Sequence, residues 1–488
     1  SEMIKFLTEP LLFDTEKGNY CYDNSTRIVI PVNKSEKNFL SAIKIGDTIH
    51  EEDFKKNNLN ELLHKIVKYN LFQSDFQLPK ITEQFIKEKL LTEGISHLCL
   101  IVTDACNFRC KYCIYSDHYF YSKNFSNKRM DFQTAKSAID YYMNVNIKSI
   151  QYNPNLSISI GFYGGEPLIN WKLIKQVVEY TNDNYKKVFD NIFFSITTNA
   201  YLLTEDKINY MFDKNFSISV SLDGDKENHD RNRVTINEKG TFDRVFKNLA
   251  LMDDIYREKV RLNKPVLPYG ILITYDNLTD FSKLDKYFME HPELDKRIQR
   301  VNRVSNINTE YYKGVQLEQS YLERRKDFIK GLIERAKDKQ FEKKATNFSK
   351  TILKSIIFDP MMNTAYSNNE LRGTCLPGIH KLAVDSDGNF HMCEKINPHY
   401  PVGNIETGLD PTKQANYMNN FFSALAGCKN CNLNNICNLC YVITETDGQG
   451  FQLKDTFCKN FREGIINSFS TYYSILENNP GIFQEIRE

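Results

Sequence analysis

The chain has 488 residues, of which 41% are hydrophobic and 26% charged, and its formal net charge is +1. This length predicts about two to four domains, and the composition is typical of a globular protein. The near-zero net charge argues against a generally basic surface that would bind nucleic acid or an anionic membrane. No apolar run is long enough to predict a membrane span, and the first residues do not have the pattern of an export signal. We therefore expect a cytoplasmic protein with no nucleic-acid or membrane partner.

The first ninety residues predict a small module of mixed structure. Residues 20–22 and 27–31 are strand-like and are separated by turn residues, which predicts a β-hairpin. Apolar residues then recur at helical spacing: Leu59, Leu62, Leu63, Ile66 and Val67. We expect residues 1–90 to form a winged-helix-like module. The alternative is a plain extension of the domain that follows.

From residue 91 the pattern changes to alternating strands and helices. Helical segments at 132–145, 171–187 and 243–258 separate apolar, strand-like runs at 98–102, 158–163, 192–196, 216–222 and 269–274. Residues 299–304 are a more polar candidate for a last strand. This alternation predicts an α/β fold with a parallel sheet and crossover helices, arranged as a partial barrel over residues 91–310. Residues 311–370 follow as a helical bridge whose interleaved charges are typical of a solvated helix face.

Ten of the twelve cysteines fall in two groups, and in a long chain without an export signal this favours metal or cluster binding over disulfides. We expect the other two, Cys21 and Cys99, to be buried as small hydrophobic residues. The first group, Cys106, Cys110 and Cys113, directly follows the first core strand. A structural zinc site needs a fourth ligand that this loop lacks. Three thiolates can instead hold a [4Fe–4S] cluster and leave one iron open.

The stretch CNFRCKYC and three later motifs, FYGGEPL, SITTNA and SLDGDKENHDRNR, each stand at the end of a predicted strand. Together they resemble the radical S-adenosylmethionine (SAM) enzymes. The resemblance implies a partial (β/α)6 barrel, a [4Fe–4S] cluster on the three cysteines and SAM at its open iron. The residues that it implies for SAM binding are Tyr112, Gly164, Gly165, Glu166, Pro167, Thr198, Asn199, Ser221, Asp223 and Arg233. From the residues alone, the glycines also suit a tight turn and Asp223 with Arg233 a structural ion pair.

The second group resembles the SPASM extension of radical SAM enzymes that modify peptides or proteins. The stretch LAVDSDGNFHMC is similar to its β-hairpin, although the pair Cys437 and Cys440 has two intervening residues where three are usual. The resemblance implies two auxiliary [4Fe–4S] clusters in a domain at 371–465, followed by a C-terminal helix at 466–488. One cluster would be held by Cys428, Cys431, Cys437 and Cys458, and the other by Cys375, Cys393 and Cys440.

Seven thiolates cannot fill two sites that each need four. Either one auxiliary iron is open, or His380 or His391 completes its site. An open iron could bind a cysteine thiolate of the substrate. Two zinc ions in place of the clusters are a further alternative.

Glu394 follows Cys393 directly, at a position where some SPASM maturases carry a catalytic base. We expect it either to remove a proton or to be a partially exposed surface carboxylate.

The resemblance implies a maturase that modifies a ribosomally made (RiPP) precursor peptide, with cysteine thioether crosslinks as the first expectation. Carbon–carbon or carbon–oxygen crosslinks and sulfatase-maturase-like oxidation are alternatives, and a non-catalytic iron–sulfur or zinc regulator belongs to a different class. The implied partners are a one-electron reductant, such as flavodoxin or ferredoxin, and the precursor peptide. The module at 1–90 would bind the leader of that peptide as a RiPP recognition element, by adding a strand to a sheet edge. A DNA-binding winged helix is less expected because this segment is not notably basic.

Overall fold

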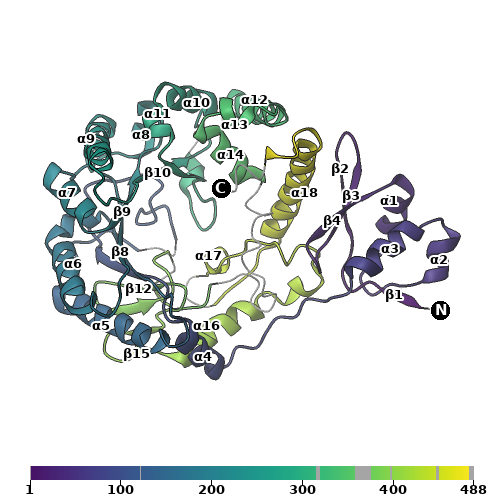
Figure 1. Cartoon of the computed structure of the whole chain (residues 1–488), viewed down its shortest axis with the longest axis horizontal. Helices are drawn as coiled ribbons and strands as arrows, with labels where there is room; N and C mark the ends of the chain where they lie inside the picture. The colour runs from purple at the N-terminus through teal and green to yellow at the C-terminus, as the bar shows by residue number, and fades with distance from the viewer. Residues whose placement is uncertain are drawn as a thin grey trace.

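The computed structural model describes residues 2–120, 123–314, 319–357, 375–395, 398–446 and 450–482. Strands and helices of the core form an arc on one side of the molecule, and the N-terminal module projects from the opposite side (Figure 1). The C-terminal helix α18 (Asp455–Asn478) lies between them. In the described residues no helix has the length and apolar character needed to cross a bilayer.

Six parallel strands form the core sheet in sequence order. They are β6 (Leu98–Thr103), β7 (Ile158–Gly164), β8 (Ile192–Thr198), β9 (Phe216–Ser221), β10 (Gly270–Tyr275) and β11 (Ile298–Arg303). Every strand predicted from the apolar runs is present, including the polar one at β11. The α/β fold with a parallel sheet and crossover helices that was expected from the sequence is therefore the observed fold.

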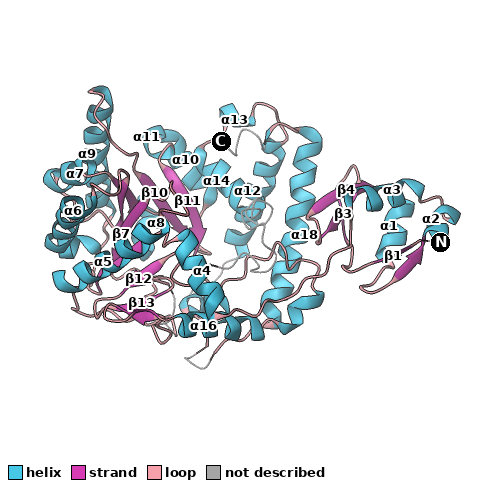
Figure 2. Cartoon of the chain, turned by 60° about the horizontal axis from the view of Figure 1, so that its bottom comes forward, coloured by secondary structure: helices cyan, strands magenta, loops and turns pink. Residues whose placement is uncertain are grey.

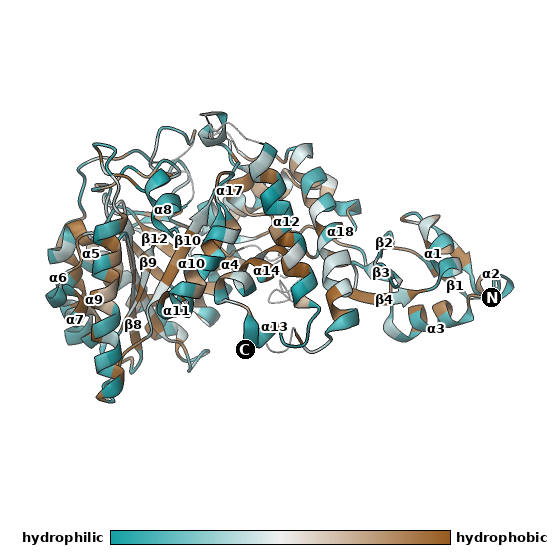
Figure 3. Ribbon diagram, turned by 90° about the horizontal axis from the view of Figure 1, so that it is seen from above, coloured by the Kyte–Doolittle hydropathy of each residue, from teal (hydrophilic) through white to brown (hydrophobic). Residues whose placement is uncertain are grey.

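Crossover helices cover the outer face of this sheet. They are α5 (Phe132–Ser149), α6 (Trp171–Tyr185), α7 (Glu205–Asp213), α8 (Lys226–Asn232), α9 (Phe242–Arg261), α10 (Phe281–Glu290) and α11 (Pro292–Asp295), with a 3-10 turn, η1, at Pro167–Asn170. Side-chain caps fix where several begin, because an oxygen of Asp131 or Thr204 accepts an N–H in the first turn of the helix that follows. Hydrophobic residues line the strands, and the helices carry hydrophilic residues as well (Figure 3).

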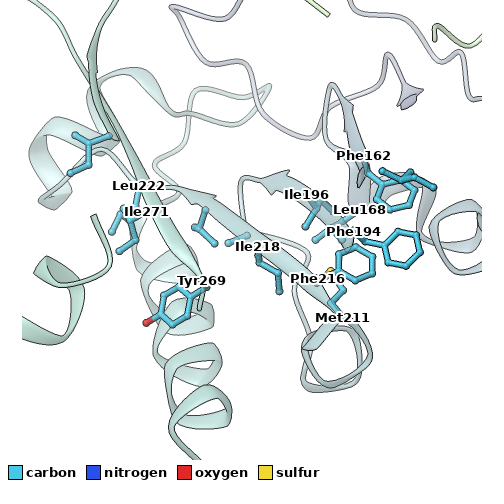
Figure 4. Packing of buried hydrophobic residues seen from close by; sticks show 14 of the residues in the cluster. Phe162, Leu168, Phe194, Ile196, Met211, Phe216, Ile218, Leu222, Tyr269 and Ile271 are labelled. Atoms are coloured by element: carbon cyan, nitrogen blue, oxygen red, sulfur yellow. The ribbon is translucent and has the colours of Figure 1, made fainter. Parts of the chain in front are cut away.

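Aromatic side chains pack between the sheet and its helices. Phe194 lies beside Phe216, with ring centroids 5.4 Å apart, and Phe162 lies 5.8 Å from Phe216 (Figure 4). The three rings come from three neighbouring strands and lie on the same face of the sheet. Side chains alternate between the two faces along each strand. The opposite face of the same strands is thereby directed into the barrel.

The cysteine-rich region continues the core sheet. Strand β12 (Leu382–Val384) pairs in parallel with β6, and β13 (Asn389–His391), β14 (Gly403–Asn404) and β15 (Gly408–Leu409) follow in antiparallel order. The antiparallel pair β12–β13 is the hairpin expected from LAVDSDGNFHMC. The region also contains α16 (Pro411–Ser423), a 3-10 helix, η5 (Ala426–Asn430), and α17 (Tyr441–Thr444).

The N-terminal module has a three-stranded antiparallel sheet of β2 (Leu11–Asp14), β3 (Asn19–Asp23) and β4 (Ile28–Val32), so the expected hairpin is present. A separate pair joins β1 (Met3–Lys5) to β5 (Thr48–His50). Its helices are α1 (Lys34–Ser41), α2 (Glu51–Lys56) and α3 (Asn60–Tyr69), and α4 (Glu83–Glu93) leads into the core. Figure 2 shows the module at one end of the molecule, joined to the body next to α18.

The helical segment after the barrel contains a 3-10 turn, η2 (Tyr311–Gly314), and α12 (Gln319–Ala336), α13 (Phe341–Lys344) and α14 (Asn347–Ile357). Residues 315–318 and 358–374, which include part of the expected bridge, lie outside the described residues. The terminal helix was expected from residue 466, but α18 begins at Asp455 and so includes Cys458. The polar and aromatic residues of its first turns hide the apolar periodicity that marks its later part.

Candidate active site and auxiliary cysteine sites

The loop after β6 brings Cys106, Cys110 and Cys113 together. The pKa of each thiol is raised, in each case chiefly by burial, and for Cys106 also by the charges of the other two. Backbone N–H groups of Phe108 and Tyr115 donate to the sulfurs of Cys106 and Cys113 at 3.4 Å. The loop therefore holds three thiols close together and already hydrogen-bonds two of them.

A second segment, residues 232–235, pairs with the cysteine loop. The N–H of Arg109 donates to the carbonyl of Val234 at 2.7 Å, and the N–H of Lys111 donates to the carbonyl of Asn232 at 3.1 Å. These bonds fix Arg233 next to the cysteines, although it is far from them in sequence.

Tyr112, Asp223 and Arg233 form one buried cluster. The Tyr112 hydroxyl donates to the Asp223 carboxylate at 2.5 Å and accepts from the Arg233 guanidinium at 2.7 Å. The N–H of Thr274 donates to the other Asp223 oxygen at 2.9 Å. Burial raises the pKa of Asp223 to about 6, although Arg233 and these hydrogen bonds oppose that rise. Three residues that the sequence assigned to SAM thus touch one another at the edge of the cysteine loop.

The GGEP motif packs directly on the cysteine loop. The N–H groups of Gly165 and Glu166 donate to the carbonyls of Thr103 and Ala105, both at 2.9 Å. A β-carbon at Gly164, where φ is +146°, or at Gly165 would collide with those same carbonyl oxygens. The two glycines are needed because the two loops approach more closely than any side chain allows.

The Glu166 carboxylate is hydrogen-bonded within the protein. It is 1% exposed, and its carboxylate accepts hydrogen bonds from the Thr198 hydroxyl at 2.7 Å and the Asn199 N–H at 2.8 Å. The Asn199 carboxamide in turn donates to Asn107 in the cysteine loop at 2.9 Å. Glu166, Thr198 and Asn199 therefore form a hydrogen-bonded support for the cysteine loop. Pro167 is the first residue of η1, and Ser221 is the last residue of β9.

These surroundings fit a cluster and a zwitterionic ligand. Burial raises the pKa of Cys110 to about 12, so its ionisation needs added positive charge, which the iron of a cluster supplies. Among the described residues, the buried Nε of Arg233 and Nδ2 of Asn107 have no hydrogen-bond partner. Unpartnered buried donors beside three thiols are suited to an anionic group such as a carboxylate.

Four of the remaining cysteines surround one small cavity. Cys428, Cys431, Cys437 and Cys458 line a space of about 50 Å³ whose other walls are mostly apolar. In the described ranges no three His, Cys, Asp or Glu side chains converge as ligands of a single metal ion would. Four thiols spread around a cavity fit a cluster of several atoms better than one zinc ion. We call this group the four-thiol site.

Cys375, Cys393 and Cys440 form a second group, the three-thiol site, on the barrel side of the region. Cys375 and Cys440 lie near enough for the charge of one to raise the pKa of the other. Lys381 and Glu394 act on the pKa of both Cys375 and Cys393. Cys375 and Cys440 are exposed, whereas in the four-thiol site Cys458 is exposed, Cys428 is buried and the other two thiols are half-buried.

Glu394 is buried, at 8% exposure, so the interpretation as a surface carboxylate is wrong. Lys381 Nζ lies 3.0 Å from each carboxylate oxygen. Burial by itself would raise the pKa of Glu394, but the Lys381 ammonium holds it below its usual value. The pair keeps an ionised carboxylate next to the three-thiol site.

One ring nitrogen of each candidate histidine ligand is hydrogen-bonded, and the buried Nδ1 of His391 has no hydrogen-bond partner among the described residues. His391 Nε2 lies 2.8 Å from an Asp385 oxygen, and His380 Nδ1 accepts the N–H of Leu376 at 2.8 Å. Cys21 and Cys99 are buried, as expected.

A cavity of about 320 Å³ lies between the cysteine loop and the cysteine-rich region. Tyr112 and Thr274 contribute to one wall, and Lys395, Val442 and Glu445 contribute to another. A second cavity of about 380 Å³ shares Ile307 and Asn308 with the first and continues towards α18. The two cavities are therefore neighbours along the same face.

Lys381, Asn107 and Arg462 were not found from the sequence. Lys381 had a usable signal, because the β12–β13 register pairs Ala383 with His391 and so puts residue 381 opposite Cys393. Arg462 lies in α18, and its guanidinium donates to the Cys431 sulfur at 3.5 Å, a contact between distant segments that no motif indicates.

Comparison with known proteins is consistent with this geometry. The model of the radical SAM superfamily matches residues 100–270. An uncharacterized protein, MJ0907, of Methanocaldococcus jannaschii is 34% identical over 201 residues, covering 41% of this chain and 60% of that relative.

Two further relatives cover more of the chain. A cysteine-type anaerobic sulfatase-maturating enzyme of Clostridium novyi is 25% identical over 382 residues, covering 76% of this chain and 94% of the relative. The radical SAM cyclopropyl synthase TigE of Paramaledivibacter caminithermalis is 25% identical over 354 residues, covering 71% of this chain and 67% of the relative.

Among solved structures, anSMEcpe with bound AdoMet is similar in fold, with a TM-score of 0.57 and 18% identity over 80% of this chain and 98% of that one. The matched segment, residues 100–270, contains the cysteine loop, the GGEP motif and Arg233. Residues 100–270 therefore match the radical SAM superfamily, and the chain is similar in fold to anSMEcpe.

Proposed function

We propose that this chain is a maturase that modifies a ribosomally made peptide, with formation of cysteine thioether crosslinks as the first expectation. The observation that carries the proposal is the 320 Å³ cavity, because one of its walls includes Tyr112 of the cysteine loop and another comes from the region of the three-thiol site. A substrate side chain in that cavity would have the SAM site on one side and a thiol-bound cluster on the other.

The residues at the SAM site would act by binding and orientation. Cys106, Cys110 and Cys113 would hold a [4Fe–4S] cluster, which together with SAM supplies a 5′-deoxyadenosyl radical for hydrogen abstraction. Arg233 has a free Nε for the carboxylate of SAM, and the Asp223–Tyr112 hydrogen bond fixes the guanidinium. Burial of this cluster of side chains keeps water away from a reactive intermediate.

The three-thiol site supports the choice of a thioether. Three thiols leave one iron of a cluster without a protein ligand, and a cysteine of the substrate could take that place. Glu394 lies 3.5 Å from the Cys393 sulfur, which places its carboxylate where a proton lost by a substrate thiol or carbon could be accepted.

The path of a peptide to this cavity is supported by the second cavity. Carboxamides of Asn306, Asn438 and Asn460 line it. Each carboxamide offers both a donor and an acceptor, which is the complement of an extended peptide backbone. We propose that the peptide lies along this second cavity, with its leader at the N-terminal module acting as a RiPP recognition element and a reductant of the flavodoxin or ferredoxin type supplying electrons.

Side-chain oxidation in a sulfatase-like protein is the second candidate. It is favoured by the sulfatase-maturating relative, which matches over 94% of its own length. The two candidates differ in the fate of sulfur, because a thioether retains the sulfur atom and removes a free thiol.

The first test is anaerobic reconstitution of the full chain with iron, sulfide, a strong reductant and SAM. Formation of 5′-deoxyadenosine is expected, and its absence from fully loaded protein would contradict any radical SAM activity. The second test is co-expression with each short reading frame beside the gene. A peptide that loses two hydrogens per link, keeps its sulfur and resists thiol alkylation would support the thioether, whereas modification of a sulfatase alone would overturn the peptide proposal.

A further inference from the structure

The four-thiol site is built against the N-terminal module through two chains of hydrogen bonds. In the first chain, Arg462 donates to the Cys431 sulfur at 3.5 Å and to the Asn432 carboxamide oxygen at 2.7 Å. Asn432 then donates to the backbone carbonyl of Glu9 at 3.2 Å. Glu9 belongs to the N-terminal module, so this chain connects the module to a thiol of the site in three steps.

The second chain begins at Asn24, in the turn between β3 and β4. Asn24 is fully buried, and its carboxamide donates to Asn434 at 2.6 Å. Asn434 donates in turn to the backbone carbonyl of Cys428 at 2.9 Å. Asn24 also accepts the N–H of Asn435 at 3.2 Å. The loop between Cys431 and Cys437 is therefore held from the module side by a buried, hydrogen-bonded amide network.

An apolar contact runs alongside these chains. Its members come from β2, β3, the loop between Cys431 and Cys437, and α18, and Cys431 packs against them: Leu11, Phe13, Tyr22, Leu433, Ile436, Ile465 and Phe469. Phe13 stacks on Phe469 with ring centroids 5.0 Å apart. Because the contact is buried and aromatic, the module and the four-thiol site should be stable only together.

We propose that Arg462 is a positioning residue for the cluster of the four-thiol site, and that the N-terminal module supports one wall of this site, the loop from Cys428 to Cys437, through Asn24 and the Glu9 carbonyl. A guanidinium that hydrogen-bonds a cluster thiolate stabilises the more negative, reduced state, and thereby raises the reduction potential. This inference requires only that the four thiols hold an iron–sulfur cluster, and it is independent of which peptide is modified.

The first experiment measures the reduction potential. The full chain is reconstituted in a background in which Cys106, Cys110 and Cys113 are alanine, so that only auxiliary clusters contribute, and is titrated anaerobically by electron paramagnetic resonance. Arg462→Gln is expected to lower the midpoint of one auxiliary signal and leave the other unchanged, and Arg462→Lys, which keeps the charge, is expected to lower it less. Arg261→Gln removes an exposed arginine of α9 and serves as the matched control.

Unchanged midpoints in Arg462→Gln would overturn the role of Arg462. If Arg462→Gln does not fold, Arg462→Lys decides the question, because loss of the guanidinium geometry alone should still shift the same signal. A shift of both auxiliary signals, or an equal shift in Arg261→Gln, would also contradict a local role.

The second experiment tests the wall formed by the module. Asn24→Ala is expected to speed the loss of one cluster's share of iron to a chelator severalfold, whereas Asn38→Ala, on the exposed face of α1, should leave the rate unchanged. If the module stabilises the cluster, the cluster must stabilise the module by the same free energy. Removing iron from the native chain should therefore increase amide hydrogen exchange in residues 11–32 of the module. Equal chelation rates for the two asparagine variants, together with exchange in residues 11–32 that is insensitive to iron, would overturn the proposal.

Discussion

The four-thiol site and the three-thiol site lie in the same region and differ in nearly every physical respect. The four-thiol site has a complete set of sulfurs and mostly apolar walls, and one wall residue, Leu433, packs against the N-terminal module. The three-thiol site is one sulfur short, has two exposed thiols and lies beside the ion pair of the buried Glu394 with the half-buried Lys381. A closed, apolar surrounding suits a group that stays in place, and an incomplete, charged one suits a group that meets a substrate.

The largest expected effect distinguishes the cysteine loop of the barrel from the two auxiliary sites. Cys110→Ala should abolish formation of 5′-deoxyadenosine, because two thiolates cannot hold the cluster in the geometry that SAM needs. Cys375→Ala should keep SAM cleavage and lose peptide modification, if the three-thiol site serves the substrate. Both products are measured by chromatography and mass spectrometry, and Cys21→Ala, in the N-terminal module, is the control. Full peptide modification by Cys375→Ala would remove the distinction between the two auxiliary sites.

The next effect concerns Glu394. Glu394→Gln should lower the rate of peptide modification by about 100-fold, the range expected for loss of a proton-accepting group, while SAM cleavage continues. The neutral amide also leaves the half-buried Lys381 ammonium without its counter-ion, so iron content and the thermal midpoint must be measured in parallel. Glu406→Gln changes an exposed carboxylate of the same region and is the matched control. Modification at the native rate would show that the pair is only structural.

Metal removal offers a test of exposure. A chelator should strip the three-thiol site severalfold faster than the four-thiol site, because two of its three thiols (Cys375 and Cys440) are exposed, against one of four (Cys458) in the other site. The order of loss can be followed by electron paramagnetic resonance in the background that lacks the three barrel-loop cysteines. Simultaneous loss of both signals would indicate that the two clusters unfold as one unit.

The smallest expected effect is at the second cavity. Asn460→Ala should raise the KM for the peptide by about 2- to 10-fold, as expected for loss of one hydrogen bond, with little change in kcat. The control is Asn38→Ala, which removes an exposed carboxamide. Asn248→Ala is an unsuitable control because the Asn248 carboxamide donates to the backbone carbonyls of Ala200 and Tyr201. A change in kcat without a change in KM would contradict a binding role for this cavity.

The sequence alone determined the barrel and the cysteine loop. Alternating apolar runs and amphipathic segments predicted all six core strands, since burial on a parallel sheet leaves a local pattern in every strand. The three cysteines and the glycines of GGEP could also be found from the sequence, because each group forms a short contiguous motif. Such features depend on residues close in sequence, and the motif order then brings them to the same edge of the sheet.

Tertiary structure decided what surrounds these motifs. The sequence left Glu394 open between a proton acceptor and a surface carboxylate, and its burial against Lys381 follows from the register of β12 and β13. The contact of Arg462 with Cys431, and that of Asn24 with the loop before Cys437, join segments separated by 31 and 411 positions. Contacts between such distant positions depend on how whole elements pack, and packing leaves no periodic or spaced signal in a single sequence. That is why the cysteines could be found from the sequence and the residues that position them could not.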